Sequence, residues 1–100
     1  MKRVEVVVVP TALEQVQRID EWWHRERVGA PDLFLDEFGA ALDRLATAPS
    51  TGMVYVGSRR EGLRRILLPR TRYHVYYVDQ HDRVVVMAVW HATRGAAPRL

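Results

Sequence analysis

The hydrophobic pattern near the C-terminus predicts a strand that lies inside a sheet. Residues 84–90 are apolar at every position, and more than half of them are valine. A run of this kind is typical of a strand buried on both faces, in the middle of a sheet. It ends abruptly in His91, Ala92, Thr93 and Arg94, so this polar end must leave the core. We therefore expect any working surface of the molecule near His91 and Arg94.

The first quarter of the chain predicts a strand followed by a helix. Residues 3–9 are almost continuously apolar, so this strand too should be well buried, and Pro10 ends it. Thr11 and Glu14 form a T-x-x-E capping box, which indicates a helix that runs to about Arg27. The apolar stripe of this helix consists of Leu13, Val16, Ile19 or Asp20, and Trp23.

A second helix follows after a short link. Gly29 is a plausible stop for the first helix, Pro31 suits the first turn of the second, and Pro49 closes it. The short link predicts an antiparallel helical hairpin. The apolar face of the second helix repeats at helical spacing and consists of Phe34, Phe38, Ala41, Leu42 and Leu45.

The second half of the chain predicts mainly strands. Residues 50–62 form a loop, with a possible short edge strand at 53–56, and residues 80–82 form a tight turn. The short links between the remaining strands indicate an antiparallel meander. These strands span residues 63–68, 72–79 and 84–90. The order β-α-α-β-β-β predicts a single α+β domain over residues 1–100, in which the helical hairpin packs on one face of a twisted, mostly antiparallel sheet.

Composition narrows the classes of protein. The chain has no cysteine, which excludes a disulfide framework and a cysteine-based metal site and fits a reducing cytoplasm. Its apolar runs are too short to span a membrane, and the N-terminus lacks the apolar core of a signal peptide. A Gly-rich phosphate loop, a G-x-S-x-G motif and paired histidines at metal-ligand spacing are missing from the sequence. We therefore predict no metal and no cofactor.

The charge is distributed unevenly along the chain. Residues 1–50 hold six Lys or Arg and nine Asp or Glu, a net charge of −3, whereas residues 51–100 hold nine Arg and three acids, a net charge of +6. Such a split suggests that an acidic partner or a nucleic acid binds the C-terminal half. Arginine suits carboxylate and phosphate equally, so the charge does not choose between them.

His91 and Arg94 are the first candidate site residues, because both follow an interior strand. They could bind a phosphate or carboxylate, with His91 moving protons near neutral pH. The alternative is a solvated strand end whose histidine satisfies a backbone group.

The arginines of the predicted meander are the second candidates. Strand alternation places Arg64 on one face and Arg65 on the other, so one of them must point toward the helices or lie at the strand's start. Arg72 shares a face with His74 and Tyr76, while the helix-facing side takes Tyr73, Val75 and Tyr77. This basic face with interleaved tyrosines could bind RNA, receive an acidic peptide, or simply be solvated.

The tryptophans are expected in the core or in a hydrophobic seam. Trp22 and Trp23 are adjacent, so they cannot both lie at the centre of one helical stripe. One of them should be partly exposed, which would indicate a protein interface.

Several motifs in this order resemble the ParE/RelE toxin superfamily over essentially the whole chain. They are a first strand that ends in proline, the helical hairpin that closes with Ala48-Pro49, Gly62-Leu63-Arg64, the segment YHVYYVD at residues 73–79, and the apolar strand that ends in HATR at residues 91–94. The resemblance implies the toxin of a type II toxin–antitoxin module, which its cognate antitoxin neutralises by direct binding in a hetero-oligomer. An acidic antitoxin would suit the Arg-rich half. The candidate binding residues are Arg59, Arg60, Arg65, Arg94 and Trp22.

The superfamily contains two activities. RelE-like members are ribosome-dependent endoribonucleases that cleave mRNA, and the candidates for such a site are Arg64, Arg72, His74 and His91, with Glu61 as a remote possibility. ParE-like members poison DNA gyrase and lack that set of groups. The chain has no lysine after Lys2 and no tyrosine after Tyr77. This departure from the RelE pattern favours the ParE-like activity. A non-toxic interaction module is the third hypothesis.

Overall fold

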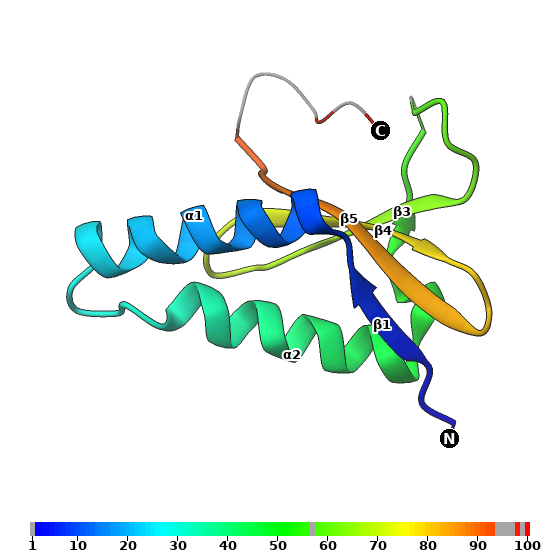
Figure 1. The fold of residues 1–100 in the computed structure, drawn as a ribbon, viewed down its shortest axis with the longest axis horizontal. Coiled ribbons are helices and arrows are strands. Elements are labelled where there is room, and N and C mark those ends of the chain that lie inside the picture. The colour runs from blue at the N-terminus through cyan, green and yellow to red at the C-terminus, as the bar shows by residue number, and fades with distance from the viewer. Residues whose placement is uncertain (1, 57, 94–97, 99) are drawn as a thin grey trace.

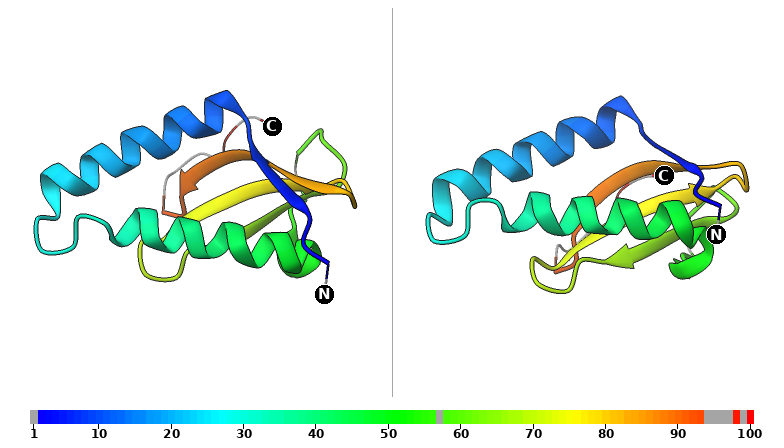
Figure 2. Two further views of the ribbon diagram at one scale, coloured as in Figure 1. Left: turned by 60° about the horizontal axis from the view of Figure 1, so that its bottom comes forward. Right: turned by 90° about the horizontal axis from the view of Figure 1, so that it is seen from below.

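The protein is a two-layer α+β structure in which two helices cover one face of a five-stranded sheet (Figures 1 and 2). The computed structural model describes residues 2–56, 58–93, 98 and 100. The predicted fold class is confirmed. The elements are β1 (Glu5–Val8), α1 (Pro10–Glu26), α2 (Leu33–Thr47), a 3₁₀ turn η1 (Pro49–Thr51), β2 (Met53–Val54), β3 (Leu63–Leu67), β4 (Tyr73–Asp79) and β5 (Arg83–His91).

The strand order of the sheet is β1-β5-β4-β3-β2. β1 pairs with β5 in parallel, and all other pairs are antiparallel. β5 therefore has neighbours on both sides, as its apolar run predicts. β1 is an edge strand, and the side chains of Val6, Val7 and Val8 are only partly buried. The expectation of a well-buried first strand is wrong, because only one neighbouring strand covers it.

β5 contains a bulge at Met87. Tyr76 of β4 pairs with Ala88, but the next residue, Tyr77, pairs with Val86, so Met87 is an extra residue in β5. An extra residue reverses the alternation of side chains beyond it. Val89 therefore joins the core under the helices, and Met87 and Ala88 join the opposite face. Strict alternation would have turned His91 to that opposite face as well.

α1 begins at Pro10, where the fixed φ angle and the missing N–H both suit the first position of a helix. The predicted capping box is wrong, because Val9 is the N-cap residue and no side chain caps the helix. The predicted stripe is confirmed at Val16 and Trp23, which are buried, and wrong at Leu13, which is 46% exposed. Ala12 occupies the core position instead, one residue from the prediction.

α2 begins at Leu33, after the N-cap residue Asp32, so Pro31 precedes the first turn rather than lying in it. Its predicted apolar face is confirmed, since these residues are buried or packed against the core: Phe34, Phe38, Ala41, Leu42 and Leu45. The side chains fill the space between α1 and the sheet, which fixes the hairpin on that face.

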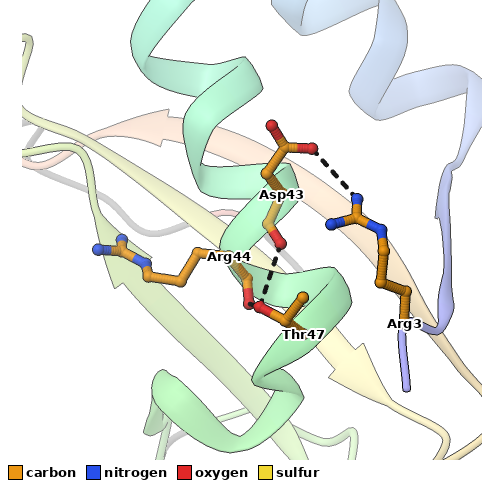
Figure 3. Close-up of polar contacts among 4 residues, drawn as sticks. All are labelled: Arg3, Asp43, Arg44 and Thr47. Atoms are coloured by element: carbon orange, nitrogen blue, oxygen red, sulfur yellow. Dashed lines mark hydrogen bonds and ion pairs between the residues drawn. The ribbon is translucent and has the colours of Figure 1, made fainter. Parts of the chain in front are cut away.

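The C-terminal end of α2 is tied to the segment before β1 (Figure 3). Arg3 lies 3.3 Å from Asp43 in an ion pair, and the N–H of Val4 donates to the carbonyl of Ala46 at 2.8 Å. The hydroxyl of Thr47 donates to main-chain carbonyls of the last helical turn. These contacts hold the edge strand beside the helix layer.

In the part of the chain that the structure describes, no helix is both long and apolar enough to cross a membrane.

Candidate partner-binding surfaces

A cleft of about 960 Å³ opens between α1 and the end of β5. We call it the α1–β5 cleft. Its walls are the C-terminal part of α1, from Gln15 to Arg27, the turn between β3 and β4, and the last residues of β5. Four aromatic side chains and three arginines line it, together with His91; they are Trp22, Trp23, Tyr73, Trp90, Arg18, Arg27 and Arg70.

His91 lies in this cleft because the bulge in β5 turns it toward the helices. Its ring meets the ring of Tyr73 edge-on, with 4.9 Å between the ring centroids. Its Nδ1 atom lies 3.2 Å from the backbone N–H of Thr93 and 2.7 Å from the hydroxyl of the same residue. Nδ1 thus accepts a hydrogen bond from the backbone just after the strand. This contact agrees with the second interpretation of His91 given above, a strand end whose histidine satisfies a backbone group. Arg94 lies outside the described residues.

Gln15 connects α1 to the strand beside the bulge. Its Oε1 atom accepts a hydrogen bond from the backbone N–H of Val89 at 2.8 Å. That donor lies next to the irregular pairing in β5, where a buried N–H needs a partner. The bond fixes the distance between the helix and the strand at the base of the cleft. A polar residue at a helical position gives no sequence signal for such a contact.

The turn between β3 and β4 forms the third wall and is held by Glu37 of α2. The Glu37 carboxylate accepts hydrogen bonds from the N–H of Arg70 at 2.8 Å, the N–H of Thr71 at 3.0 Å and the hydroxyl of Thr71 at 2.6 Å. Burial raises the pKa of this carboxyl, but the bonds from Thr71 and Arg70 outweigh burial and leave the pKa below its ordinary value. The next residue, Arg72, has a φ angle of 68°. This is a turn conformation, whereas the sequence predicted that Arg72 would begin a strand.

The three arginines give the lining of the cleft a positive charge, although Arg70 lies close enough to Glu37 for its charge to lower the pKa of that carboxyl. Arg18, Arg27 and Arg70 make no ion pair with any residue that the structure describes. The Arg27 guanidinium lies over the rings of Trp22 and Trp23, at 5.0 Å and 5.9 Å from the ring centroids. Trp22 is 37% exposed, as expected for one of the two adjacent tryptophans. The cleft is therefore both aromatic and cationic.

A second basic surface lies on the side of the sheet that faces away from the helices, which we call the open sheet face. There the Arg65 guanidinium lies 4.9 Å from the ring centroid of Tyr55 and donates a 3.3 Å hydrogen bond to the hydroxyl of Tyr76. His74 is beside them, 6.0 Å from Tyr76 between ring centroids. Burial, and then the charges of Arg65 and Arg72, lower the pKa of His74 below its ordinary value and so favour the neutral ring. Tyr76 is only 2% exposed, so its ring is not free for base stacking.

Arg64 lies on the other face of β3, toward the helices. Its guanidinium donates to the backbone carbonyl of Gly52 at 2.7 Å and to that of Ser50 at 3.3 Å. The Tyr77 hydroxyl reaches the same loop, where it donates to Pro49 and accepts from the N–H of Gly52. Burial raises the pKa of this phenol. Arg64 thus stabilises the loop after α2 by hydrogen bonds to its backbone carbonyls.

The four candidate nuclease residues do not all meet in one place, although Arg72 lies close enough to His74 for its charge to lower the pKa of that ring. His91 lies in the α1–β5 cleft, and His74 lies on the open sheet face. Arg64 is bonded to loop carbonyls, and Arg72 lies in the turn before β4. Arg59 and Arg60, the candidates for partner binding, are exposed in the loop between β2 and β3 together with Glu61. Within residues 2–56 and 58–93, no group of three or more His, Asp or Glu could hold a metal ion.

These features define a small two-layer α+β protein with two basic, aromatic surfaces. Residues 6–95 match the family described as the ParE toxin of type II toxin-antitoxin system, parDE. The chain therefore belongs to the ParE toxin family, and the resemblance drawn from the sequence is confirmed.

Structural comparison agrees with this assignment. The fold is similar to the solved structure titled "Chromosomal ParDE TA system from P. aeruginosa", with a TM-score of 0.66 and 13% sequence identity over 89% of this chain and 96% of that chain. At this identity the likeness concerns the fold. No curated protein matches the sequence.

Proposed function

We propose that this ParE toxin acts without catalysis, by binding DNA gyrase in the cytoplasm, and that a cognate antitoxin neutralises it by covering its basic surfaces. The separation of the groups that an endoribonuclease would need carries the proposal. RNA cleavage through the 2′-OH needs an acid or base and phosphate-binding groups around one phosphate. His74 and His91 lie on opposite faces of the sheet, so they do not serve one phosphate together.

The arginines support binding to an acidic antitoxin. Arg18, Arg27 and Arg70 around the cleft, and Arg59 and Arg60 in the loop, make no ion pair within the described residues. Uncompensated charges of one sign speed the encounter with a partner of opposite sign and give the complex specificity. A hetero-oligomer with the antitoxin follows from the same argument.

A split assay on purified toxin, freed from its antitoxin, tests the proposed target. DNA supercoiling by gyrase is measured in one reaction, and cleavage of mRNA on translating ribosomes in the other. We expect supercoiling to be inhibited and mRNA to stay intact. Cuts in mRNA with normal supercoiling would overturn the proposal and assign the chain to the RelE-like activity. Inactivity in both reactions would instead support a non-toxic interaction module.

A further inference from the structure

The α1–β5 cleft contains a buried hydrogen-bond donor without an acceptor. Trp23 is 9% exposed, and its indole Nε1 has no hydrogen-bond partner among the residues that the structure describes. A buried indole N–H usually finds an acceptor, because leaving one unpaired costs about 1–3 kcal/mol. The same side chain lines the cleft. An acceptor supplied by a bound partner would remove this cost.

The length of the cleft fits a segment of polypeptide. Its α1 wall runs from Gln15 to Arg27. At 1.5 Å per residue this is roughly 18 Å along the helix axis, or about three helical turns. A partner helix of similar length could lie beside α1, with apolar side chains against Trp22 and Tyr73, as in other helix-in-groove complexes. A single phosphate group would fill only a small part of this length.

The charge of the cleft fixes the chemistry of the segment. Arg18, Arg27 and Arg70 lie around the aromatic floor, and no carboxylate lies among the lining residues. Arg27 lies over the exposed ring of Trp22, so a carboxylate that meets Arg27 also brings its own backbone to the aromatic floor. An acidic, amphipathic segment satisfies the guanidinium groups and covers the rings at once.

We propose that the α1–β5 cleft is the docking site of an acidic amphipathic segment of the antitoxin, and that an oxygen atom of this segment accepts a hydrogen bond from Trp23 Nε1. The inference rests on the proposed function, since it presupposes an antitoxin. It assigns the main contact to the cleft rather than to Arg59 and Arg60 in the loop or to Arg65 on the open sheet face.

Two substitutions in the cleft test this assignment. The probe is the protein encoded beside this chain, provided that its co-expression suppresses the growth defect. We expect Arg27→Glu to raise the Kd for this protein about tenfold or more, because it places like charges together. Trp23→Phe keeps an aromatic ring and removes the unpaired N–H, so it should not lower the melting temperature of the free toxin, whereas it should still raise the Kd. Calorimetric titration gives both Kd values.

Matched controls make the result specific. Arg83→Glu makes the same charge reversal at the opposite end of β5, and Trp22→Phe changes the neighbouring indole. We expect the Kd to stay within about twofold for Arg83→Glu and to rise less for Trp22→Phe than for Trp23→Phe. Arg59→Glu combined with Arg60→Glu should have a smaller effect than Arg27→Glu alone.

Other outcomes would overturn the docking site. Unchanged binding by both cleft variants would do so, as would a loss of binding confined to the Arg59 and Arg60 variant. A shift in tryptophan fluorescence on titration with ATP, lost in Arg27→Glu while antitoxin binding persists, would assign the cleft to a small anion. If no protein encoded beside the chain suppresses its toxicity, the proposed function fails as well, so the two failures are distinguishable.

Discussion

Tyr77 shows how one side chain holds a loop whose own residues form no long element. It is fully buried, and its hydroxyl bridges the carbonyl of Pro49 at 2.7 Å and the N–H of Gly52 at 2.8 Å. Gly52 lies so close that a Cβ atom there would come 2.6 Å from the Tyr77 oxygen and 2.9 Å from the Arg65 carbonyl. The contact therefore depends on glycine at this position.

We expect Tyr77→Phe to lower the free energy of unfolding by about 1–3 kcal/mol, because it leaves the buried N–H of Gly52 and the partly buried carbonyl of Pro49 without this partner. Urea denaturation followed by circular dichroism measures the change. Tyr73→Phe is the matched control, since no hydrogen bond of the Tyr73 hydroxyl is found within the described residues. Equal effects of the two substitutions would show that the bridge contributes nothing.

The second prediction for a single residue concerns how the Glu37 carboxylate stabilises the fold at different pH values. Its lowered pKa means that it stabilises the fold above its ordinary pKa of 4.5 and loses this effect as the pH falls through the lower folded-state value. Glu37→Gln places an amide where two N–H groups need an acceptor, and we expect a loss of about 1–3 kcal/mol at pH 7. The loss should shrink as the pH falls below 4.5 and the wild-type carboxyl becomes protonated.

Thermal unfolding across this pH range checks the Glu37 prediction, with Glu21→Gln on the exposed face of α1 as the control. A deficit for Glu37→Gln that stays constant with pH would contradict the role of the carboxylate. The sequence does not reveal this contact, because Glu37 and the turn at residues 70–71 are far apart in the chain and meet only through packing.

At the scale of elements, His24 joins the end of α1 to the start of α2. Its Nδ1 atom lies 2.9 Å from the backbone carbonyl of Asp20 and 3.2 Å from the carboxylate of the same residue, and its Nε2 atom lies 3.1 Å from Asp32. The Nδ1 hydrogen bond goes to the carbonyl, and the Asp20 carboxylate makes an ion-pair contact without a hydrogen bond. The hydrogen bond to the Asp20 carbonyl is the largest cause and raises the pKa of His24. Desolvation, the next largest, opposes it, and the carboxylates of Asp20 and Asp32 add to the rise, so that the pKa lies above its ordinary value.

We expect the hairpin to be more stable in mild acid. A raised folded-state pKa gives stability that is fully present below the ordinary value of 6.5 and is lost as the pH rises through the folded-state value. Asp32→Asn should lower the pKa of His24, and it should lower the melting temperature at about pH 5.5 more than at about pH 8.5. An NMR titration of the His24 ring protons checks the first effect, with Asp36→Asn as control. An unchanged titration curve would refute the link between the helices.

The periodicity of apolar residues predicted the existence and order of both helices and of the four longer strands. In each of these elements the buried residues recur at the spacing of a helix or of a strand. The sequence pattern gave wrong predictions where contacts between elements determine how a helix starts, how it is rotated, or which face a strand residue lies on. Pro10 begins α1 directly and makes the capping box unnecessary, and α1 is rotated so that Ala12 replaces Leu13 in the core. The bulge at Met87 is invisible in a uniform run of apolar residues, yet it determines the face on which His91 lies.

At the scale of the whole molecule, the separation of the two histidines has a direct consequence for toxicity. We expect the double variant His74→Ala, His91→Ala to inhibit gyrase supercoiling within about threefold of the wild type, because neither ring moves a proton in a binding mechanism. An endoribonuclease would lose at least about a hundredfold of its rate. A collapse of the gyrase inhibition by a folded double variant would contradict the mechanism proposed here.

The sequence indicated a functional end of the sheet near His91, but most of the α1–β5 cleft could not be predicted from it. Of its arginines, Arg18 lies on α1 and Arg27 directly follows that helix, both in the acidic half of the chain, and Arg70 lies in a turn. Their proximity follows from how the helical hairpin sits on the sheet. The sequence predicted that one of the two adjacent tryptophans would be partly exposed, because both cannot share the centre of one helical stripe. The exposed one is Trp22.

The pairing of β1 with β5 affects the moment at which the protein becomes active. Val6, near the beginning of the chain, finds its partner Val84 only near the end, and the parallel edge of the sheet cannot close before then. Contacts between such distant residues also slow folding. A ribosome must therefore synthesise the chain as far as residue 86 before this edge of the sheet can form. Under the proposed function, an antitoxin that recognises the folded sheet would meet each new molecule only after that point.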